Sequence, residues 1–337
     1  MTLNVIVGGF FGDEGKGKII SYLSIKDQVT LAARGGVGPN AGHTVVINDK
    51  ILKLRQLPSA TVNEKTRLLI GPGVLINPRI FLEEVEVTGT SNRVGIDYQA
   101  GIIENKHIEI DSQNSYLKEK IGTTKTGCGP ANAERAYRTL KLAKDIEELK
   151  PFLTDVPGEI NEAVDRGENI ILEGTQGTFL SLYHGTYPYV TSKDVTASAI
   201  CSDVGVGPKK VDHVIVVFKS YVTRVGEGPL EGELPPKEIE KRGWVEKGTV
   251  TGRLRRAAEF NFKLAKRAVM LNSATQIALT KLDKLFPEIY RATRFEDLPL
   301  KAKQFIEKIE ETLKVPVTLI GTGPDLNDII DLRKEKL

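Results

Sequence analysis

Short β-branched runs alternate with amphipathic runs along the chain. The first apolar run, residues 4–7, ends in two glycines, and the pattern over residues 16–23 predicts a helix. Two runs, 44–47 and 51–54, flank Asn48-Asp49 and predict a β-hairpin. Further strands are predicted at residues 170–172, 211–218, 275–280 and 315–320, and further helices at 78–87, 131–150 and 159–166.

These strands run into polar or glycine-rich loops. The alternation predicts an α/β fold, with a mainly parallel central sheet, helices on both faces, and a core like that of P-loop NTPases with insertions. In such sheets ligands bind where the strands end. Because no repeat or low-complexity linker divides the 337 residues, we expect one domain over residues 1–337 with peripheral subdomain insertions.

The composition narrows the class of protein. The chain is 40% hydrophobic and 27% charged, with 47 basic and 44 acidic residues, so no strong net charge favours a nucleic acid or a membrane surface as partner. The sequence shows no apolar stretch of membrane-spanning length and no signal peptide. Two cysteines, Cys128 and Cys201, cannot form a disulfide framework. We therefore expect a cytoplasmic protein.

The first glycine loop, residues 8–18, joins the first strand to the first helix. It holds five glycines, two acids and two lysines. Glycines admit a phosphate, and the helix N-terminus and lysines attract it. Residues 12–18 match the GxxxxGK part of a Walker A loop, but Ile19 stands where the Mg²⁺-binding Ser or Thr is expected. Asp13 could supply a metal-binding oxygen instead. A tight turn with solvated charges is the alternative, which the density of charges disfavours.

A second glycine-rich loop covers residues 34–44 and contains His43. It suits a phosphate cradle, with His43 as an acid or hydrogen-bond donor near a γ-phosphate. A lone histidine is more often structural, and His107, His184 and His213 are read in that way.

The predicted strand 275–280 leads into Lys281-Leu282-Asp283. A carboxylate in this position can accept hydrogen bonds from the ring N–H and the exocyclic amine of guanine, while the lysine stem covers the ring. The four-residue pattern Thr-Lys-x-Asp is weak alone, and a surface Lys-Asp pair is its commoner explanation. Combined with the first loop, it favours GTP over ATP.

Together these segments resemble the adenylosuccinate synthetase family, over nearly the whole chain. The resemblance implies that GTP phosphorylates the 6-oxygen of IMP and that the amine of L-aspartate then displaces phosphate, on the route from IMP to AMP in purine biosynthesis. The matching blocks are residues 12–18, 40–44, 122–124, 173–177, 184–192, 223–226, 248–253, 280–283 and 321–324.

The same resemblance implies residue roles. Asp13 would remove the N1 proton of IMP and bind Mg²⁺ together with the Gly42 carbonyl, His43 would act as acid, and Lys16 would steady the transferred phosphoryl group. The implied IMP contacts are Asp13, Lys16, Asn40, Ala41, Gly42, His43, Thr124, Arg138, Gln176, Thr191 and Arg253. The implied aspartate contacts are Thr249, Val250, Thr251, Gly252 and Arg253. The implied GTP contacts are Gly12, Asp13, Glu14, Gly15, Lys16, Gly42, His43, Thr44, Arg255, Lys281, Asp283, Gly321, Thr322 and Gly323.

By its spacing after residues 122–124, Arg138 resembles an arginine that reaches the IMP phosphate of a neighbouring subunit. The resemblance thus implies a homodimer with shared sites. A solvated helix face is the alternative explanation of Arg138. The chain also departs from common family members: it is shorter, chiefly between Gly101 and Gly122 and in its C-terminal half, and Phe10-Phe11 replaces Gln-Trp.

Two other function classes fit parts of the sequence. A GTP-binding switch explains residues 280–283 and the first loop, but leaves residues 173–192 and 248–256 without a role. The second alternative is a kinase or carboxylate ligase that uses ATP on another small anion. Preference for GTP or ATP would distinguish it from a GTP-dependent synthetase. Residues 248–256 carry three arginines but no aromatic platform, which argues against a nucleic-acid site.

Overall fold

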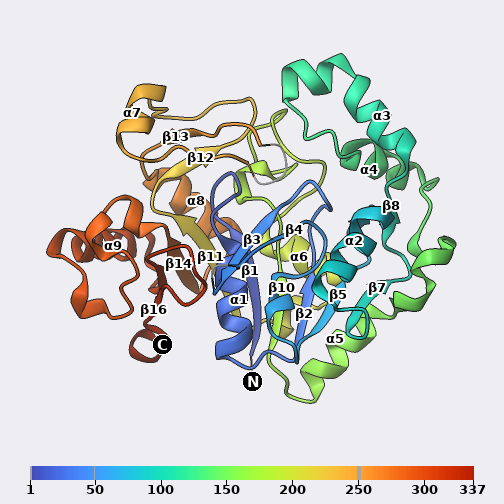
Figure 1. The fold of residues 1–337 in the computed structure, drawn as a ribbon, viewed down its shortest axis with the longest axis horizontal. Coiled ribbons are helices and arrows are strands. Elements are labelled where there is room, and N and C mark those ends of the chain that lie inside the picture. The colour runs from blue at the N-terminus through green and yellow to red at the C-terminus, as the bar shows by residue number, and fades with distance from the viewer. Residues whose placement is uncertain (1, 49, 249–251) are drawn as a thin grey trace.

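The core of the protein is a ten-stranded sheet (Figure 1). The computed structural model describes residues 2–48, 50–248 and 252–337. All neighbouring strands of the sheet run parallel, except that the edge strand β16 is antiparallel to β15. In spatial order the strands are β16 (Ile329–Asp331), β15 (Val317–Gly321), β14 (Gln276–Thr280), β11 (His213–Lys219), β1 (Leu3–Gly8), β10 (Ile170–Glu173), β2 (Leu31–Arg34), β5 (Arg67–Ile70), β7 (Val94–Asp97) and β9 (Leu153–Thr154).

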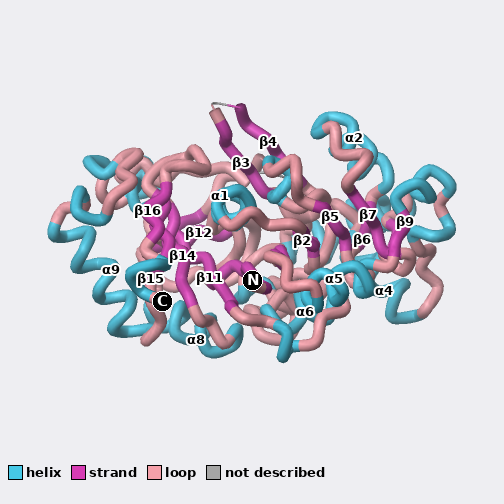
Figure 2. The backbone as a smooth tube through the Cα atoms, turned by 90° about the horizontal axis from the view of Figure 1, so that it is seen from below, coloured by secondary structure: helices cyan, strands magenta, loops and turns pink. Residues whose placement is uncertain are grey.

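Helices cover both faces of this sheet, as Figure 2 shows edge-on. Alternate side chains of β1 enter two different cores: Val5 and Val7 pack in one, and Ile6 packs in the other. The first core is covered by α5 (Val156–Asp165), α6 (Ala197–Val204), α8 (Phe262–Asn272) and α9 (Leu300–Leu313). The second is covered by α1 (Lys16–Lys26) and α2 (Pro78–Thr88). The mainly parallel α/β fold predicted from the sequence is confirmed.

Smaller elements stand at the periphery of the sheet (Figure 1). An antiparallel hairpin of β3 (His43–Ile47) and β4 (Lys50–Leu54) confirms the predicted hairpin, although Asp49 lies outside the described residues. The other peripheral elements are β6 (Leu75–Ile76), β8 (Gly101–Ile102), α3 (Asn105–Gln113), α4 (Cys128–Tyr137), β12 (Val222–Arg224), α7 (Pro236–Lys241), β13 (Arg256–Ala258) and α10 (Arg333–Lys336). The single-domain organisation stays a prediction.

One predicted helix is wrong in its second half. The predicted segment 131–150 continues only to Tyr137, where α4 ends. Arg138 has a left-handed backbone (φ 66°), and its N–H and that of Thr139 bond back to the carbonyls of Arg135 and Glu134, which closes the helix. The chain then continues in short 3₁₀ turns as far as Phe152. Helix propensity did not reveal this stop because no glycine or proline marks it.

The pattern did not single out β2, β5 and β7. Each has four residues, and their side chains are buried or nearly so on both faces. Such runs lack the alternation of apolar and polar positions that marks a half-buried strand. No helix in the described part of the chain is long and apolar enough to cross a membrane.

Candidate active site

A cavity of about 730 Å³ opens at the carboxyl ends of the central strands. Its wall includes Asp13 from the loop after β1, Gln176 from the loop after β10, and Thr280 at the end of β14. The loops that sequence analysis singled out thus meet in one place. This is where a parallel α/β sheet binds its ligands.

The first glycine loop is held in shape from inside by Glu14. Its carboxylate is 1% exposed and accepts hydrogen bonds from the backbone N–H groups of Phe10 (3.0 Å) and Gly12 (2.7 Å) and from the Lys16 ammonium (3.0 Å). Asp13 has a left-handed backbone, with φ 61°, and its side chain lines the cavity. Glu14, predicted as a GTP contact, does not line the cavity and instead fixes the loop.

The two lysines of this loop have different surroundings. Lys16 lines the cavity, and its ammonium also contacts the backbone carbonyl of Gln176. Lys18 also borders the cavity, but its ammonium donates to the backbone carbonyls of Gly323 and of Asp328, the latter at 2.7 Å. Burial lowers the pKa of Lys18 to about 8, and nearby carboxylates oppose the shift. Lys18 therefore ties the 321–324 turn to α1.

His43 stands in a buried charged network. Arg34 ends β2 and Glu173 ends the neighbouring β10, and the two residues are register partners in the sheet. The Arg34 guanidinium lies 2.6 Å from the Glu173 carboxylate, which also accepts from the Ser59 N–H at 2.6 Å. The His43 Nδ1 contacts the same carboxylate. This arrangement fixes the orientation of the imidazole ring.

The other ring nitrogen of His43, Nε2, has no hydrogen-bond partner among the described residues. Burial lowers the pKa of His43, and the Arg34 charge adds to this effect, so the free imidazole is neutral at pH 7. With Glu173 accepting the Nδ1 proton, Nε2 is left for a ligand. The sequence contained both partners, since Arg34 begins the second loop and Glu173 begins a family block, but it could not show that they meet.

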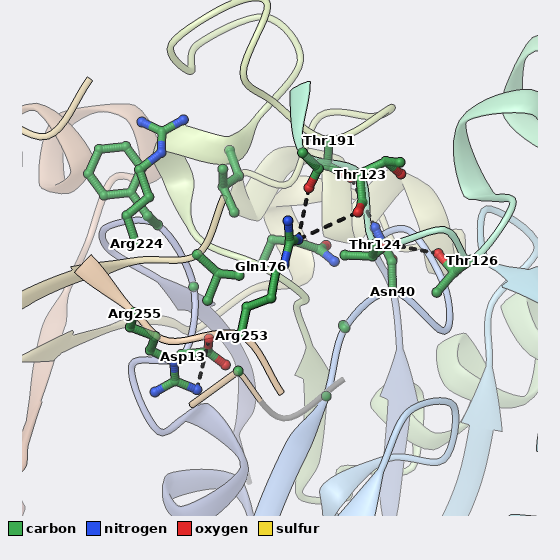
Figure 3. Close-up of a pocket in the computed structure, with 18 of the residues that line it drawn as sticks. Asp13, Asn40, Thr123, Thr124, Thr126, Gln176, Thr191, Arg224, Arg253 and Arg255 are labelled. Atoms are coloured by element: carbon green, nitrogen blue, oxygen red, sulfur yellow. Dashed lines mark hydrogen bonds and ion pairs between the residues drawn. The ribbon is translucent and has the colours of Figure 1, made fainter. Parts of the chain in front are cut away.

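A group of polar side chains lines the side of the cavity shown in Figure 3. The Asn40 amide donates to the Thr191 hydroxyl (3.2 Å), and the Arg253 guanidinium donates to the backbone carbonyl of Gly122 (2.8 Å). Both amide atoms of Gln176 are buried and have no partner among the described residues. Five of the predicted IMP contacts, Asn40, Thr124, Gln176, Thr191 and Arg253, therefore line one cavity.

Predicted GTP contacts occupy another part of the same wall. Arg255 pairs with the Asp13 carboxylate at 2.9 Å (Figure 3), and Lys281 lies at the end of β14. The predicted residues that line the cavity are Gly12, Asp13, Gly15, Lys16, Asn40, Ala41, Gly42, His43, Thr44, Thr124, Gln176, Thr191, Arg253, Arg255, Lys281 and Gly323.

Several predicted residues do not line the cavity. Asp283 is 8% exposed, and burial raises its pKa while three nearby lysines oppose the shift. The Thr322 hydroxyl donates to the backbone carbonyl of Ala292 (2.7 Å). Arg138 is exposed at the end of α4. Gly252 and Gly321 are likewise outside the lining, and Thr249, Val250 and Thr251 lie outside the described residues.

No three His, Cys, Asp or Glu side chains of the described residues form a group that could hold a metal ion. Asp13 and Gly42 both line the cavity, and they offer a carboxylate and a backbone carbonyl. Oxygen ligands of this kind suit Mg²⁺, which protein sites commonly bind through one or two carboxylates plus substrate phosphates. The residues present therefore fit Mg²⁺ bound together with a nucleotide.

Comparison with known proteins identifies the family of the chain. The adenylosuccinate synthetase family model matches residues 5–146, 139–290 and 286–330. The chain is 57% identical to the adenylosuccinate synthetase of Archaeoglobus fulgidus and 56% identical to that of Pyrococcus horikoshii; these alignments cover 100% and 98% of both chains. Its short length is thus shared by these relatives.

Two solved structures resemble the whole chain. A fully ligated adenylosuccinate synthetase from Plasmodium falciparum is 29% identical with a TM-score of 0.91, over 98% of this chain and 100% of that one. A succinoaminodeoxyadenylate synthetase from cyanophage S-2L, bound to dGMP and to dATP as an energy donor, is 25% identical with a TM-score of 0.81, over 98% of this chain and 95% of that one. The chain belongs to the adenylosuccinate synthetase family.

Proposed function

We propose that the cavity at the carboxyl ends of the central strands is where this chain performs the reaction of its family, with Asp13, Lys16 and His43 as the catalytic residues. The chain is a GTP-dependent carbon–nitrogen ligase that joins L-aspartate to IMP and yields adenylosuccinate, GDP and phosphate. The observation that carries the residue assignment is the convergence of these three side chains, from two separate loops, on one cavity at the start of α1.

The chemistry requires the 6-oxygen of IMP to become a better leaving group. In the proposed first step Asp13 takes the N1 proton, and the 6-oxygen attacks the γ-phosphorus of GTP, whose bond to the β,γ-bridging oxygen breaks. In the second step the amine of aspartate attacks C6, loses a proton, and displaces phosphate. A phosphoryl transfer of this kind depends chiefly on positioning and on charge stabilisation.

Lys16 and His43 are placed for that stabilisation. The ammonium of Lys16 is 3.0 Å from the Glu14 carboxylate, so a full positive charge is held in place at the N-terminus of α1. His43 lines the cavity, and its Nε2 has no hydrogen-bond partner among the described residues while Glu173 accepts from Nδ1. A phosphoryl group beside Nε2 favours the protonated imidazole, and Glu173 stabilises that cation. His43 can then donate to the departing phosphate.

Mg²⁺ is the expected metal ion, with the Asp13 carboxylate and the Gly42 carbonyl as its protein ligands. When bound, it would neutralise charge that develops on the phosphate oxygens. Asp13 pairs with Arg255 at 2.9 Å. Sharing of this carboxylate between the metal ion and the N1 proton requires the Arg255–Asp13 contact to open, while the other end of the guanidinium stays on Glu246.

Guanine recognition is assigned to Lys281, Asp283 and the 321–324 turn. A related synthetase takes dATP as its energy donor, so the fold alone does not set the nucleotide. Asp283 supports GTP because its carboxylate can accept from both guanine donors, which adenine does not offer. Lys281 lines the cavity, whereas Asp283 stands just outside the lining, 8% exposed. Contact with a base would therefore require a small adjustment of this segment.

We further assign Arg138 to the site of a second subunit and expect a homodimer in the cytoplasm. Arg138 is exposed and does not line the cavity of its own chain. Its place at the end of α4 leaves the guanidinium available to an IMP phosphate across an interface. Thr249, Val250, Thr251 and Gly252, with Arg253, are assigned to the carboxylates of aspartate.

The direct test supplies purified protein with GTP, IMP, L-aspartate and Mg²⁺, and follows adenylosuccinate by absorbance. Omission of any one component should stop its formation, and replacement of GTP by ATP should lower it strongly. Folded protein that consumes no GTP in the complete mixture would contradict the proposal. Equal rates with ATP and GTP would contradict the guanine assignment alone.

A further inference from the structure

One carboxylate in the cavity wall has no role in the assignments above. Glu246 is 10% exposed, and its two oxygens are contacted by four side chains. The Lys219 ammonium lies 3.0 Å from Oε2, which the Arg255 guanidinium also contacts. The Lys281 ammonium and the Tyr221 hydroxyl contact Oε1. Three cations thus meet on one anion.

The position of Glu246 in the chain explains why it connects two parts of the site. The Arg255 N–H bonds to the Glu246 carbonyl (2.9 Å), Lys247 and Leu254 form an antiparallel bridge, and the Gly248 N–H bonds to the Arg253 carbonyl (2.9 Å). Residues 246–248 and 253–255 are therefore the two sides of a narrow hairpin. Glu246 lies at its base and reaches across to Lys281 after β14.

We propose that Glu246 is a positioning residue that holds Lys281 and Arg255 in a fixed relation, and so aligns the nucleotide with the first glycine loop. The inference rests on the proposed function, because it uses the roles assigned to those two cations. Glu246 contacts the ammonium group at the end of the Lys281 side chain, so the methylene stem of Lys281 is left to lie along a base. It holds one end of the Arg255 guanidinium, while the other end reaches Asp13 at 2.9 Å.

The charges of the cluster support this role over simple packing. Burial alone would raise the pKa of Glu246, but Lys219, Lys281 and Arg255 outweigh it and lower that pKa well below the usual range. Glu246 is therefore ionised at neutral pH. Without its charge, Asp13 would be the only carboxylate among the described residues that pairs with any of the three cations, and of these Arg255 alone contacts it. Lys281 would then lose the partner that sets its direction.

The test compares Glu246→Gln with Glu233→Gln, in the full chain. The control carboxylate, that of Glu233, pairs with the neighbouring arginine Arg256 (2.9 Å) and is 39% exposed. Dissociation constants of Mg²⁺–GTP are measured by calorimetry, without IMP or aspartate, and KM values for all three substrates are measured by initial rates. We expect Glu246→Gln to raise the dissociation constant of Mg²⁺–GTP about tenfold and to change the KM for IMP by less than about twofold. Glu233→Gln should change neither quantity.

Two further variants separate positioning from stability. Glu246→Asp keeps the charge but withdraws it by one methylene, so a positioning role predicts weak GTP binding even when thermal unfolding is restored to that of the parent. Because Glu246 acts partly through Lys281, adding Glu246→Gln to Lys281→Met should weaken GTP binding by less than Glu246→Gln does in the parent protein.

Unchanged GTP binding in Glu246→Gln, or full recovery of binding in Glu246→Asp, would overturn the inference. So would additive effects of Glu246→Gln and Lys281→Met. Failure of the parent protein to bind GTP would instead overturn the proposed function. The two results are distinguished by the parent measurement alone.

Discussion

The two walls of the cavity differ in how their side chains are held. The wall that we propose to be catalytic is formed by Asp13, Lys16 and His43. It is backed by Glu14 and Glu173, which are 1% and 0% exposed and lie in or next to the central sheet. The recognition wall, Arg253, Arg255 and Lys281, is held by a backbone carbonyl and by Glu246, which is 10% exposed at the base of a hairpin.

This difference suggests a division of labour. Groups that stabilise a transition state are effective when they need not reorganise, and a buried carboxylate in a sheet provides that rigidity. A group that binds the substrate and the transition state equally well affects KM and leaves kcat unchanged. We therefore expect changes on the catalytic wall to lower kcat, and changes on the recognition wall to raise KM.

The largest effect is expected from Asp13. Asp13→Ala should lower kcat by about 10³-fold, because the N1 proton then has no acceptor and Mg²⁺ loses a ligand. Since Asp13 has φ 61°, Asp13→Asn serves as the matched variant, as asparagine tolerates this backbone. Asp13→Asn should unfold at a temperature close to that of the parent, and Asp13→Ala at a lower one, because alanine is disfavoured at this φ. Substantial turnover by Asp13→Asn would remove Asp13 as the base.

The next largest effect is expected from Glu173. Glu173→Gln leaves Arg34 and His43 buried without their anion, which should cost about 3 kcal/mol of unfolding free energy. A displaced imidazole should also lower kcat by about 100-fold, with KM values little changed. Urea unfolding and initial rates measure the two effects. Glu159→Gln is the control, because that carboxylate pairs with Arg67 at 2.9 Å and is 30% exposed. A raised KM with normal kcat would reverse the proposed division between the walls.

The fold was largely predictable, because the strands of a parallel sheet have a simple sequence pattern. Strands such as β1, β11 and β14 are apolar runs that end in glycine or polar loops, and these ends mark the site. The stop of α4 at Tyr137 was not predictable, because it depends on a left-handed Arg138. Short buried strands such as β2 lack a periodic signal.

The loops that form the site were predictable from the sequence, but the ion pairs and hydrogen bonds that hold their side chains were not. Asp13, Lys16 and His43 stand in glycine-rich segments with a recognisable chemistry. The partners of His43 come from strand register, since Arg34 and Glu173 are 139 residues apart and meet only because β2 and β10 are neighbours. Glu246 likewise contacts Lys281 across 35 residues of chain. A single sequence contains no record of such pairings.

The third effect concerns guanine recognition. Asp283→Asn should weaken GTP binding by about 10- to 100-fold, since a hydrogen bond to a charged acceptor contributes about 1.5–3 kcal/mol. The KM for IMP should change by less than about twofold. Asp297→Asn, an exposed partner of Arg294 at 2.7 Å, is the control. Selectivity for GTP over ATP should also fall. Equal weakening of GTP and IMP would mean that Asp283 supports the whole cavity and does not read guanine.

The smallest effect is expected from Arg138, which belongs to neither wall of its own cavity. Arg138→Leu should raise the KM for IMP by about tenfold through one lost charge-assisted phosphate contact. Lys144→Leu, an exposed cation nearby in the chain, should change nothing. Because the arginine would serve the opposite subunit, mixing Arg138→Leu with inactive Asp13→Ala should restore one intact site per mixed dimer. Activity above the sum of the two separate variants would show that sites are shared. Without that gain, the cavity is complete in a single chain, and the division between its two walls would describe the entire active site.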